Sequence, residues 1–233
     1  MPPAKPPQPP HELDAVRARV ADIRQRRGYV LPSHAALAVA DPVLLEQYER
    51  VYNTITFGFH ALTPFEKNFV WLVVVGCAET PTGAAHLSDF LAAGGTRAQV
   101  DAAAQLALVA IGARMLDVFG PGWQRVLADF DADAAYAGAI DRLVSGTGLA
   151  AALVEIALAA GQACRRDWRR VEFHIVRAKQ LGVSDEALVE GLTVCILPAG
   201  NPGFVQACAT WRRLVAEGKV DASPALRAAV DAL

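Results

Sequence analysis

The sequence has no excess of charge of either sign. Its 22 lysine and arginine residues and 24 aspartate and glutamate residues give a formal net charge of −2 with histidine neutral. The isoelectric point lies near 6.2. Proteins that bind nucleic acid usually carry a clustered basic face and a high isoelectric point. Nucleic acid is therefore not an expected partner.

Long uninterrupted apolar runs are also missing. The longest, Phe69 to Ala78, has about half of the ~20 residues that a membrane-spanning helix needs, and Lys67 and Glu79 flank it. The N-terminal sequence MPPAKPPQPP lacks the apolar stretch of a secretory signal. We expect a cytoplasmic protein with no membrane partner, in which residues 1–11 form a disordered, proline-rich arm.

Cysteine is scarce. The four cysteines, Cys77, Cys164, Cys195 and Cys208, show neither metal-ligand spacing nor the pattern of a small disulfide-rich domain. We expect reduced, mostly buried thiols and no metal site.

Strand patterns are absent as well, since no segment alternates apolar and polar residues in a sustained way, and alanine and leucine are abundant. An apolar fraction of 53% predicts an extensive core. Caps, helix-stop glycines and 3-to-4 spacing predict an all-α fold. The expected helices are 12–27, 41–58, 63–77, a helix carrying His86 that stops at Gly94, 96–112, 149–164, 167–181 and 184–197.

Rare residues and glycines recur at a constant offset of 88 positions. The matched pairs are Tyr48 and Tyr136, Gly58 and Gly146, His86 and His174, Gly94 and Gly182, Gly112 and Gly200, Trp123 and Trp211, and Arg125 and Arg213. A fixed offset predicts duplication of one helical unit. We expect a helical extension at 12–40, repeats at 41–128 and 129–217, and a tail or helix at 218–233.

One acid and one imidazole stand out in the second repeat. Glu155 interrupts the apolar run LAAALVEIALAA, and His174 lies on the next helix. The two positions are at similar height on a helical hairpin, so their side chains can meet. A buried carboxylate must be paired, protonated or beside water, and burial raises its pKa toward the range useful for proton transfer. A purely structural ion pair is the alternative.

Other polar residues fall near this pair. Asp167 lies two helical turns before His174, and Glu79 stands in the same relation to His86; charge at a helix start would explain both equally well. Arg170 could hold a substrate carboxylate through its planar fork. Trp168 could cover a pocket or simply pack.

The segment HIVRAKQLGVSDEALVEGLTVCILPAGNPGFVQA, residues 174–207, resembles the carboxymuconolactone decarboxylase and alkylhydroperoxidase D-like (AhpD-like) superfamily. The segment that starts at His86 is similar but weaker, and together the two cover roughly residues 63–211. The resemblance implies helical repeats that assemble as homotrimers or hexamers, with sites in clefts near subunit boundaries. It also implies a functional Glu and His at Glu155 and His174.

The chain departs from that family at two points. The peroxidase branch carries a C-x-x-C motif where this chain has Asp167 and Arg170, or Glu79 and Thr82 in the first repeat. Dithiol peroxide reduction needs two thiols within disulfide reach, so we expect it to be absent. The decarboxylase branch has Glu at the position of Arg170, which leaves the substrate open.

The leading hypothesis is therefore a cofactor-independent acid–base enzyme for a small organic acid, lactone or carbonyl compound. It would catalyse decarboxylation or a proton shift, with His174 transferring the proton, Glu155 as its partner and Asp167 as a secondary candidate. Arg170 and Trp168 would bind the substrate. In the first repeat, His86, Glu79 and Lys67 would form a degenerate site or a buttress.

Two alternatives stay open. The first is a single-cysteine peroxidase using Cys164 or Cys77, with Arg165 and Arg166 lowering the pKa of Cys164. The second is an oligomeric binding or scaffold protein without catalysis, since a fold does not establish an activity.

Overall fold

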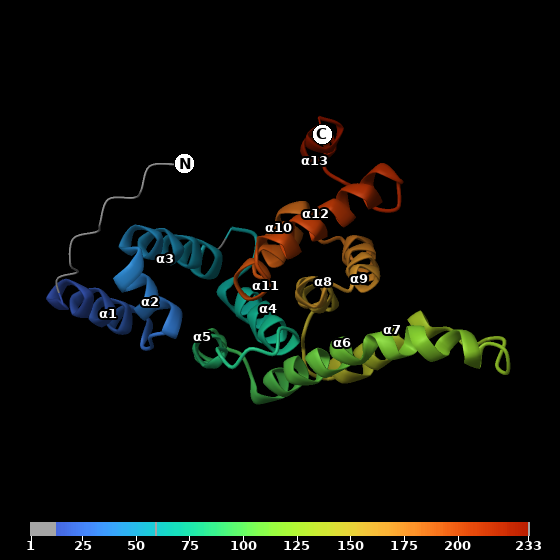
Figure 1. Ribbon diagram of the computed structural model, residues 1–233. Coiled ribbons are helices and arrows are strands. Elements are labelled where there is room, and N and C mark those ends of the chain that lie inside the picture. Colours follow the sequence, from blue (N-terminus) through green and yellow to red (C-terminus); the bar gives the residue numbers. More distant parts are fainter. Residues whose placement is uncertain (1–12, 59, 233) are drawn as a thin grey trace, which may run out of the picture. The chain divides into compact units, whose positions relative to one another are not determined.

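The computed structural model describes residues 13–58 and 60–232, and this part of the chain is all-α, as expected, with no strand (Figure 1). The predicted arm at residues 1–11 lies outside the described residues. The helices are α1 (Leu13–Arg27), α2 (Pro32–Ala40), α3 (Pro42–Phe57), α4 (Pro64–Cys77), α5 (Ala84–Ala92), α6 (Arg97–Trp123), α7 (Ala132–Val144), α8 (Ala151–Arg165), α9 (Trp168–Gln180), α10 (Asp185–Thr193), α11 (Ile196–Ala199), α12 (Asn201–Ala216) and α13 (Pro224–Asp231).

The chain divides into two compact units, Met1–Thr54 and Ile55–Leu233, and the division falls inside α3. The first unit holds α1, α2 and most of α3. The second holds all the later helices, so the helices of both predicted repeats from α4 onward share one compact unit. The repeat boundaries expected at residues 40/41 and 128/129 stay predictions.

The first unit has a small core of its own, formed by Ile23, Ala38 and Leu45. Gly28 ends α1 with a φ of +77°, a conformation that glycine adopts without strain. The α2 helix was not predicted. It begins at Pro32, which suits the first position of a helix because its missing N–H needs no partner there.

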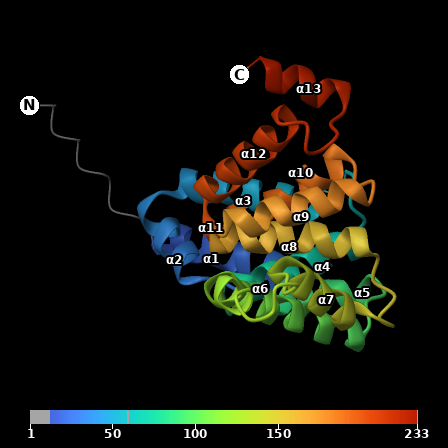
Figure 2. The ribbon, with the colours of Figure 1, turned by 90° about the vertical axis from the view of Figure 1, so that its right-hand side faces the viewer.

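In the second unit, α8 is the central helix. Every residue of α8 from Leu153 to Ala163 is buried, and Figure 2 shows α8 between α4 and α9. Small residues permit this close packing. A Cβ added at Gly161 would lie 2.7 Å from Cys77 Sγ, so the Cys77 side chain of α4 packs directly on the backbone of α8.

Two predicted helix ends in the second unit are wrong. α6 continues past Gly112 to Trp123, because a glycine inside a helix costs only about 1 kcal/mol and the neighbouring Ala110 and Ala113 are buried. By contrast, α10 ends at Thr193 instead of near residue 197, and the short α11 follows.

One helix of the described residues, α6, is long and apolar enough to cross a membrane by length and composition alone, although only 33% of its apolar window is buried. A search for uninterrupted apolar runs misses α6 because polar side chains break up its sequence. Core helices of water-soluble proteins pass the same test when protein covers them, so the exposed part of α6 is the informative feature.

Candidate functional site

The hairpin of α8 and α9 forms as predicted around a two-residue turn. Arg166 ends α8 in the left-handed conformation, with a φ of +56°. Asp167 then caps α9, because its carboxylate accepts a hydrogen bond of 3.2 Å from the backbone N–H of Arg170. The tight turn returns α9 along α8 and fixes which residues face each other.

The hairpin brings Glu155 and His174 into direct contact. Glu155 Oε2 and His174 Nδ1 are 2.6 Å apart. The two residues are 1% and 0% exposed. A buried charge needs hydrogen-bonding partners, and this pair supplies one for each residue.

Tyr136 of α7 extends this pair into a chain of hydrogen bonds. Its Oη lies 3.0 Å from His174 Nε2, so Glu155, His174 and Tyr136 form one buried series across three helices. Gln162 of α8 donates to Tyr136 Oη at 3.2 Å and to the carbonyl of Ala110 at 3.0 Å. We call Glu155, His174 and Tyr136 the relay. Gln162 holds the phenol at its end.

The hydrogen-bond partners assign the protons of the relay. A carboxylate of Glu155 accepts the Nδ1–H of His174, which leaves Nε2 to accept the phenol O–H of Tyr136. Burial lowers the pKa of His174, and nearby Arg177 and Arg170 lower it further, although Glu155 opposes them. Burial also raises the pKa of Tyr136. The resting relay therefore holds a neutral imidazole and a protonated phenol.

Arg177 connects the relay to the protein surface. Its Nε donates to Glu155 Oε1 at 2.6 Å, and its Nη2 donates to Asp141 at 3.2 Å. The Arg177 side chain is 26% exposed, whereas that of Glu155 is 1% exposed. Both oxygens of the Glu155 carboxylate thus have a partner, and only the arginine partner reaches solvent.

A surface groove lies beside the relay, between α7 and α9. It has a cavity volume of about 690 Å³, and Phe173, Arg169 and Arg177 are among its lining residues. The ring centroid of Phe173 is 5.6 Å from that of Tyr136 and 5.2 Å from that of His174. One aromatic side chain therefore contacts both the groove and the relay. A groove of this size can hold a small organic molecule.

Arg170, the predicted substrate anchor, contacts protein carboxylates instead. It is fully buried, and its two terminal nitrogens donate to Asp133 and Asp117 at 2.7 Å each. Its guanidinium carbon also lies 4.5 Å from the ring centroid of Tyr136. In this arrangement Arg170 ties α9 to α6 and α7 and supports the relay phenol.

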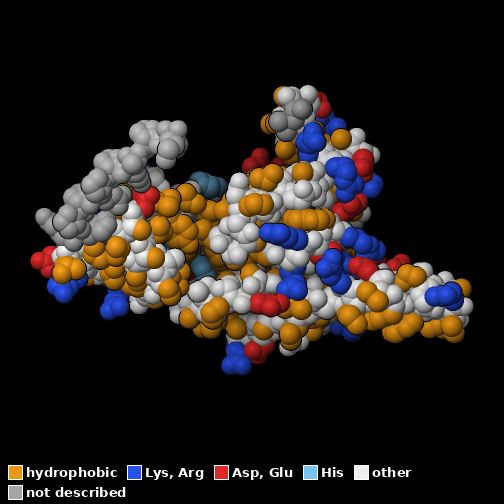
Figure 3. Space-filling view, in the orientation of Figure 1, with side chains coloured by type: hydrophobic (Ala, Val, Ile, Leu, Met, Phe, Trp, Pro, Cys, Tyr) orange, Lys and Arg blue, Asp and Glu red, His pale blue; other side chains and the backbone are white. Residues whose placement is uncertain are grey.

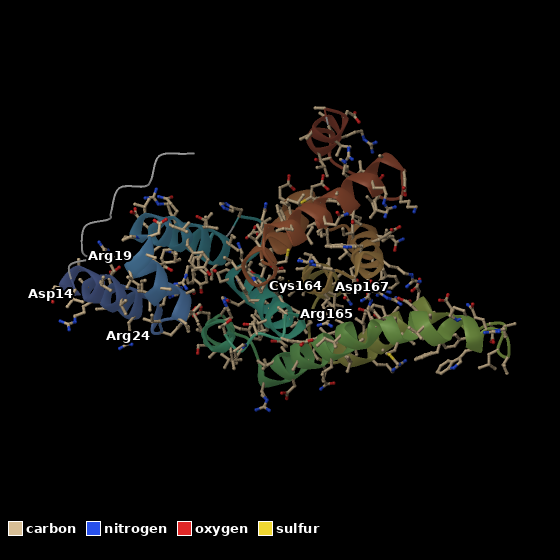
Figure 4. All side chains as sticks on the ribbon, viewed as in Figure 1. Asp14, Arg19, Arg24, Cys164, Arg165 and Asp167 are labelled. Atoms are coloured by element: carbon tan, nitrogen blue, oxygen red, sulfur yellow. The ribbon has the colours of Figure 1, made fainter. Side chains whose placement is uncertain are left out.

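The remaining second-repeat candidates lie around the hairpin turn. Figure 4 labels Cys164, Arg165 and Asp167 there. Asp167 serves as the cap of α9, and its other oxygen is 3.8 Å from Arg114 Nε. Trp168 is half-buried and packs against the core. These contacts account for Asp167 and Trp168 as structural residues.

The first-repeat candidates make contacts of a different kind. Lys67, at the position equivalent to Glu155, pairs with Glu190 of α10 at 2.8 Å. His86 stacks on Trp71, with ring centroids 4.1 Å apart. Glu79 is exposed and pairs with Arg165. These contacts are structural ones, and the two roles expected of these residues, a degenerate site or a buttress, stay predictions.

The thiols lie in surroundings that disfavour the thiolate. Contact with the Cys195 thiol and burial raise the pKa of Cys164, and burial raises that of Cys77 to about 12. A single-cysteine peroxidase needs a lowered thiol pKa. These surroundings oppose the thiolate that the peroxidase alternative requires.

No group of three or more histidine, cysteine, aspartate or glutamate side chains in residues 13–58 and 60–232 is arranged to hold a metal ion. Comparisons with protein-family models, curated proteins and solved structures found no match for this chain. The fold and the relay define an all-α protein with a buried carboxylate–imidazole–phenol series. Any closer classification of the protein must rest on the chemistry of these residues.

The buried imidazole predicts a pH dependence of stability. Because the folded-state pKa of His174 is lowered, the unfolded chain binds a proton below about pH 6.5 that the folded chain does not. The contribution of neutral His174 to the free energy of unfolding is complete above that pH and is lost as the pH falls. We expect the free energy of unfolding to decrease by up to roughly 1.4 kcal/mol per pH unit for this residue.

Urea unfolding, measured at a series of pH values for the parent and for His174→Gln, tests this expectation. The variant should show a shallower slope. His34, buried in the first unit with a pKa also lowered by burial, adds a background that both proteins share. Identical slopes in the two proteins would show that folding leaves the pKa of His174 unchanged.

Proposed function

We propose that this chain is a cofactor-independent acid–base enzyme of the carboxymuconolactone decarboxylase and AhpD-like type. It acts on a small organic acid, lactone or carbonyl compound by decarboxylation or a proton shift, without dithiol chemistry. The observation that carries the proposal is the hydrogen-bonded series Glu155–His174–Tyr136, with contacts of 2.6 and 3.0 Å. Such a series can take up and return a proton near neutral pH.

The duplication is part of the proposal, and several local features support it. Thr96 and Ser184, 88 positions apart, both cap helices with their hydroxyl groups. Gly94 and Gly182 both have positive φ angles, +93° and +78°. The two repeats would then differ where function requires it, since Glu155 in one corresponds to Lys67 in the other.

Protons can move along the relay in two directions. When the Tyr136 phenol gives a proton to a substrate carbon or oxygen, the amide N–H of Gln162 and the nearby guanidinium of Arg170 stabilise the phenolate. In the reverse sense, Tyr136 Oη takes a substrate proton and passes its own to His174. The carboxylate of Glu155 stabilises the imidazolium that forms. In a decarboxylation, the electron pair left when carbon dioxide departs would receive the proton from Tyr136.

The groove provides the place for the substrate. Phe173 separates it from Tyr136 and His174, so a rotation of that ring would bring a bound molecule next to the phenol. Arg177 faces the groove and also holds Glu155. A substrate carboxylate could therefore draw Arg177 toward itself. Lid-like motions of this kind often accompany catalysis.

The test is a panel of small lactones, keto acids and unsaturated acids incubated with the protein in D2O. Proton NMR follows deuterium incorporation and loss of carbon dioxide. We expect turnover of at least one compound, and a loss of roughly 100-fold or more in His174→Gln and Glu155→Gln. The exposed Glu186 supplies the control Glu186→Gln, which should keep the parental rate. Folded relay variants that keep the parental rate would contradict the proposal.

A second candidate function is that of a binding or scaffold protein without catalysis. The observation that favours it is the burial of the relay, because Glu155, His174 and Tyr136 are each no more than 1% exposed. Under this alternative the relay only holds α7, α8 and α9 together. No turnover in the panel, together with a loss of stability in the same two variants, would favour it.

A further inference from the structure

The helix α6 carries apolar residues on two faces. One face, which includes Leu106, Ala110 and Ala113, is buried in the core of the second unit. On the other face Leu108, Met115 and Val118 are 68%, 58% and 75% exposed. A run of exposed apolar side chains along one helix face often marks a surface that a partner covers. The second face of α6 therefore indicates a missing partner.

The residues of this face, four of them exposed and one, Ile111, half-buried, follow the spacing of a helix-pairing surface. Ala104, Leu108, Ile111, Met115 and Val118 are separated by alternating steps of four and three residues. This is the spacing by which two helices interlock side chains along a common line. We call these five residues the α6 seam. Figure 3 shows hydrophobic side chains gathered along the edge of the molecule formed by α6 and the turn after it.

A glycine lies at the middle of the seam. Gly112 is exposed inside a continuous helix, where glycine is unfavourable relative to alanine, and a Cβ added there would meet nothing within 4 Å. No contact within residues 13–58 and 60–232 therefore explains this glycine. A glycine at the centre of a pairing surface allows two helices to approach closely.

We propose that the α6 seam is a contact between two copies of this chain, whose α6 helices pack antiparallel across a two-fold axis near Ile111 and Gly112. A two-fold contact uses the same surface on both copies, so it must be complementary to itself. Antiparallel pairing about this centre sets Leu108 of one copy against Met115 of the other.

The charges near the ends of α6 and the area of its exposed apolar surface are both consistent with antiparallel pairing. The pairing brings the exposed Asp101, near one end of α6, close to the exposed Arg125 of the second copy beyond the other end. Trp123, Val126 and Leu127 add exposed apolar surface after the seam. At on the order of 100 Å² for each large exposed side chain, one copy offers roughly 600 Å², near the ~800 Å² per partner of a stable interface.

The first experiment measures the mass of the full chain in solution by light scattering over a dilution series. We expect a self-associated parent, and a dissociation constant raised roughly 100-fold or more in Leu108→Glu. The matched control is Leu181→Glu, which changes another exposed leucine (48%) outside the seam and should leave association unchanged. A parent that is monomeric at every concentration would overturn the proposal.

The second experiment tests the register. A short bismaleimide should join two Gly112→Cys chains, whereas Ala104→Cys chains should join poorly because antiparallel pairing separates the two copies of that residue by ~20 Å. The parent, with its four native cysteines, gives the background. Equal yields at both positions would overturn the antiparallel arrangement.

A monomeric parent that floats with phosphatidylcholine vesicles would assign the seam to lipid instead. This inference does not depend on the proposed function.

Discussion

Replacing Glu155 with leucine is expected to lower the free energy of unfolding by about 3–5 kcal/mol, because it removes the acceptor of two hydrogen bonds and leaves both donors without a partner. Two short contacts, with His174 and Arg177, would be lost together. Leucine has nearly the same volume as glutamate, so a cavity does not explain the loss. Urea unfolding followed by circular dichroism measures the difference.

The control for this change is Glu186→Leu on the exposed side of α10. Surface substitutions usually change stability by no more than about 0.5 kcal/mol. The double variant Glu155→Leu with His174→Leu should recover part of the loss, because it removes one of the two partners left behind. A Glu155→Leu protein as stable as the parent would show that the hydrogen bonds of Glu155 to His174 and Arg177 do not stabilise the fold.

Replacing Arg170 with methionine is expected to lower the free energy of unfolding by about 2–3 kcal/mol. The guanidinium is fully buried between Asp133 and Asp117, but both aspartates are partly exposed and can regain water, so the loss should be smaller than for Glu155. The support that Arg170 gives to Tyr136 would also be lost.

Arg169 provides a matched control for this second prediction. It pairs with the same two aspartates at 2.8 and 3.0 Å, but its side chain is 53% exposed. We expect Arg169→Met to cost less than about 1 kcal/mol, since exposed ion pairs contribute little. Equal effects at Arg169 and Arg170 would show that burial of the guanidinium is unimportant. Unchanged stability in Arg170→Met, with a raised KM, would return Arg170 to the role of substrate anchor.

The sequence predicts the contact between Glu155 and His174 because both residues lie on the same helical hairpin. Glu155 and His174 are 19 residues apart on one hairpin, and the helix signals place them at the same height. Tyr136, Gln162 and Arg177 were not predicted as members of the site. Tyr136 belongs to another helix, 38 residues away from His174. The one available sign was its match with Tyr48 in the 88-residue offset, which gives no contact partner.

The charged cluster RRDWRR, residues 165–170, is a second case in which contacts with distant helices decide the role of a side chain. The sequence predicts that Arg170 binds a substrate carboxylate, because it does not say which aspartates lie opposite this arginine. Asp117 and Asp133 come from α6 and α7. Arg170 faces inward toward them, and its neighbour Arg169 is half-exposed. One step of about 100° around the helix separates a buried structural arginine from a surface one.

The sequence by itself determined the all-α class, the stops at Gly28, Gly94 and Gly182 and the facing of Glu155 and His174, since these depend on local backbone preference and helical periodicity. Only the tertiary structure decided that Tyr136 completes the relay, that Arg170 binds two aspartates, and that α6 continues through Gly112 with an exposed apolar seam. Those outcomes depend on contacts between distant helices, whose packing outweighs the small local cost of a glycine or fixes the direction of a charged side chain.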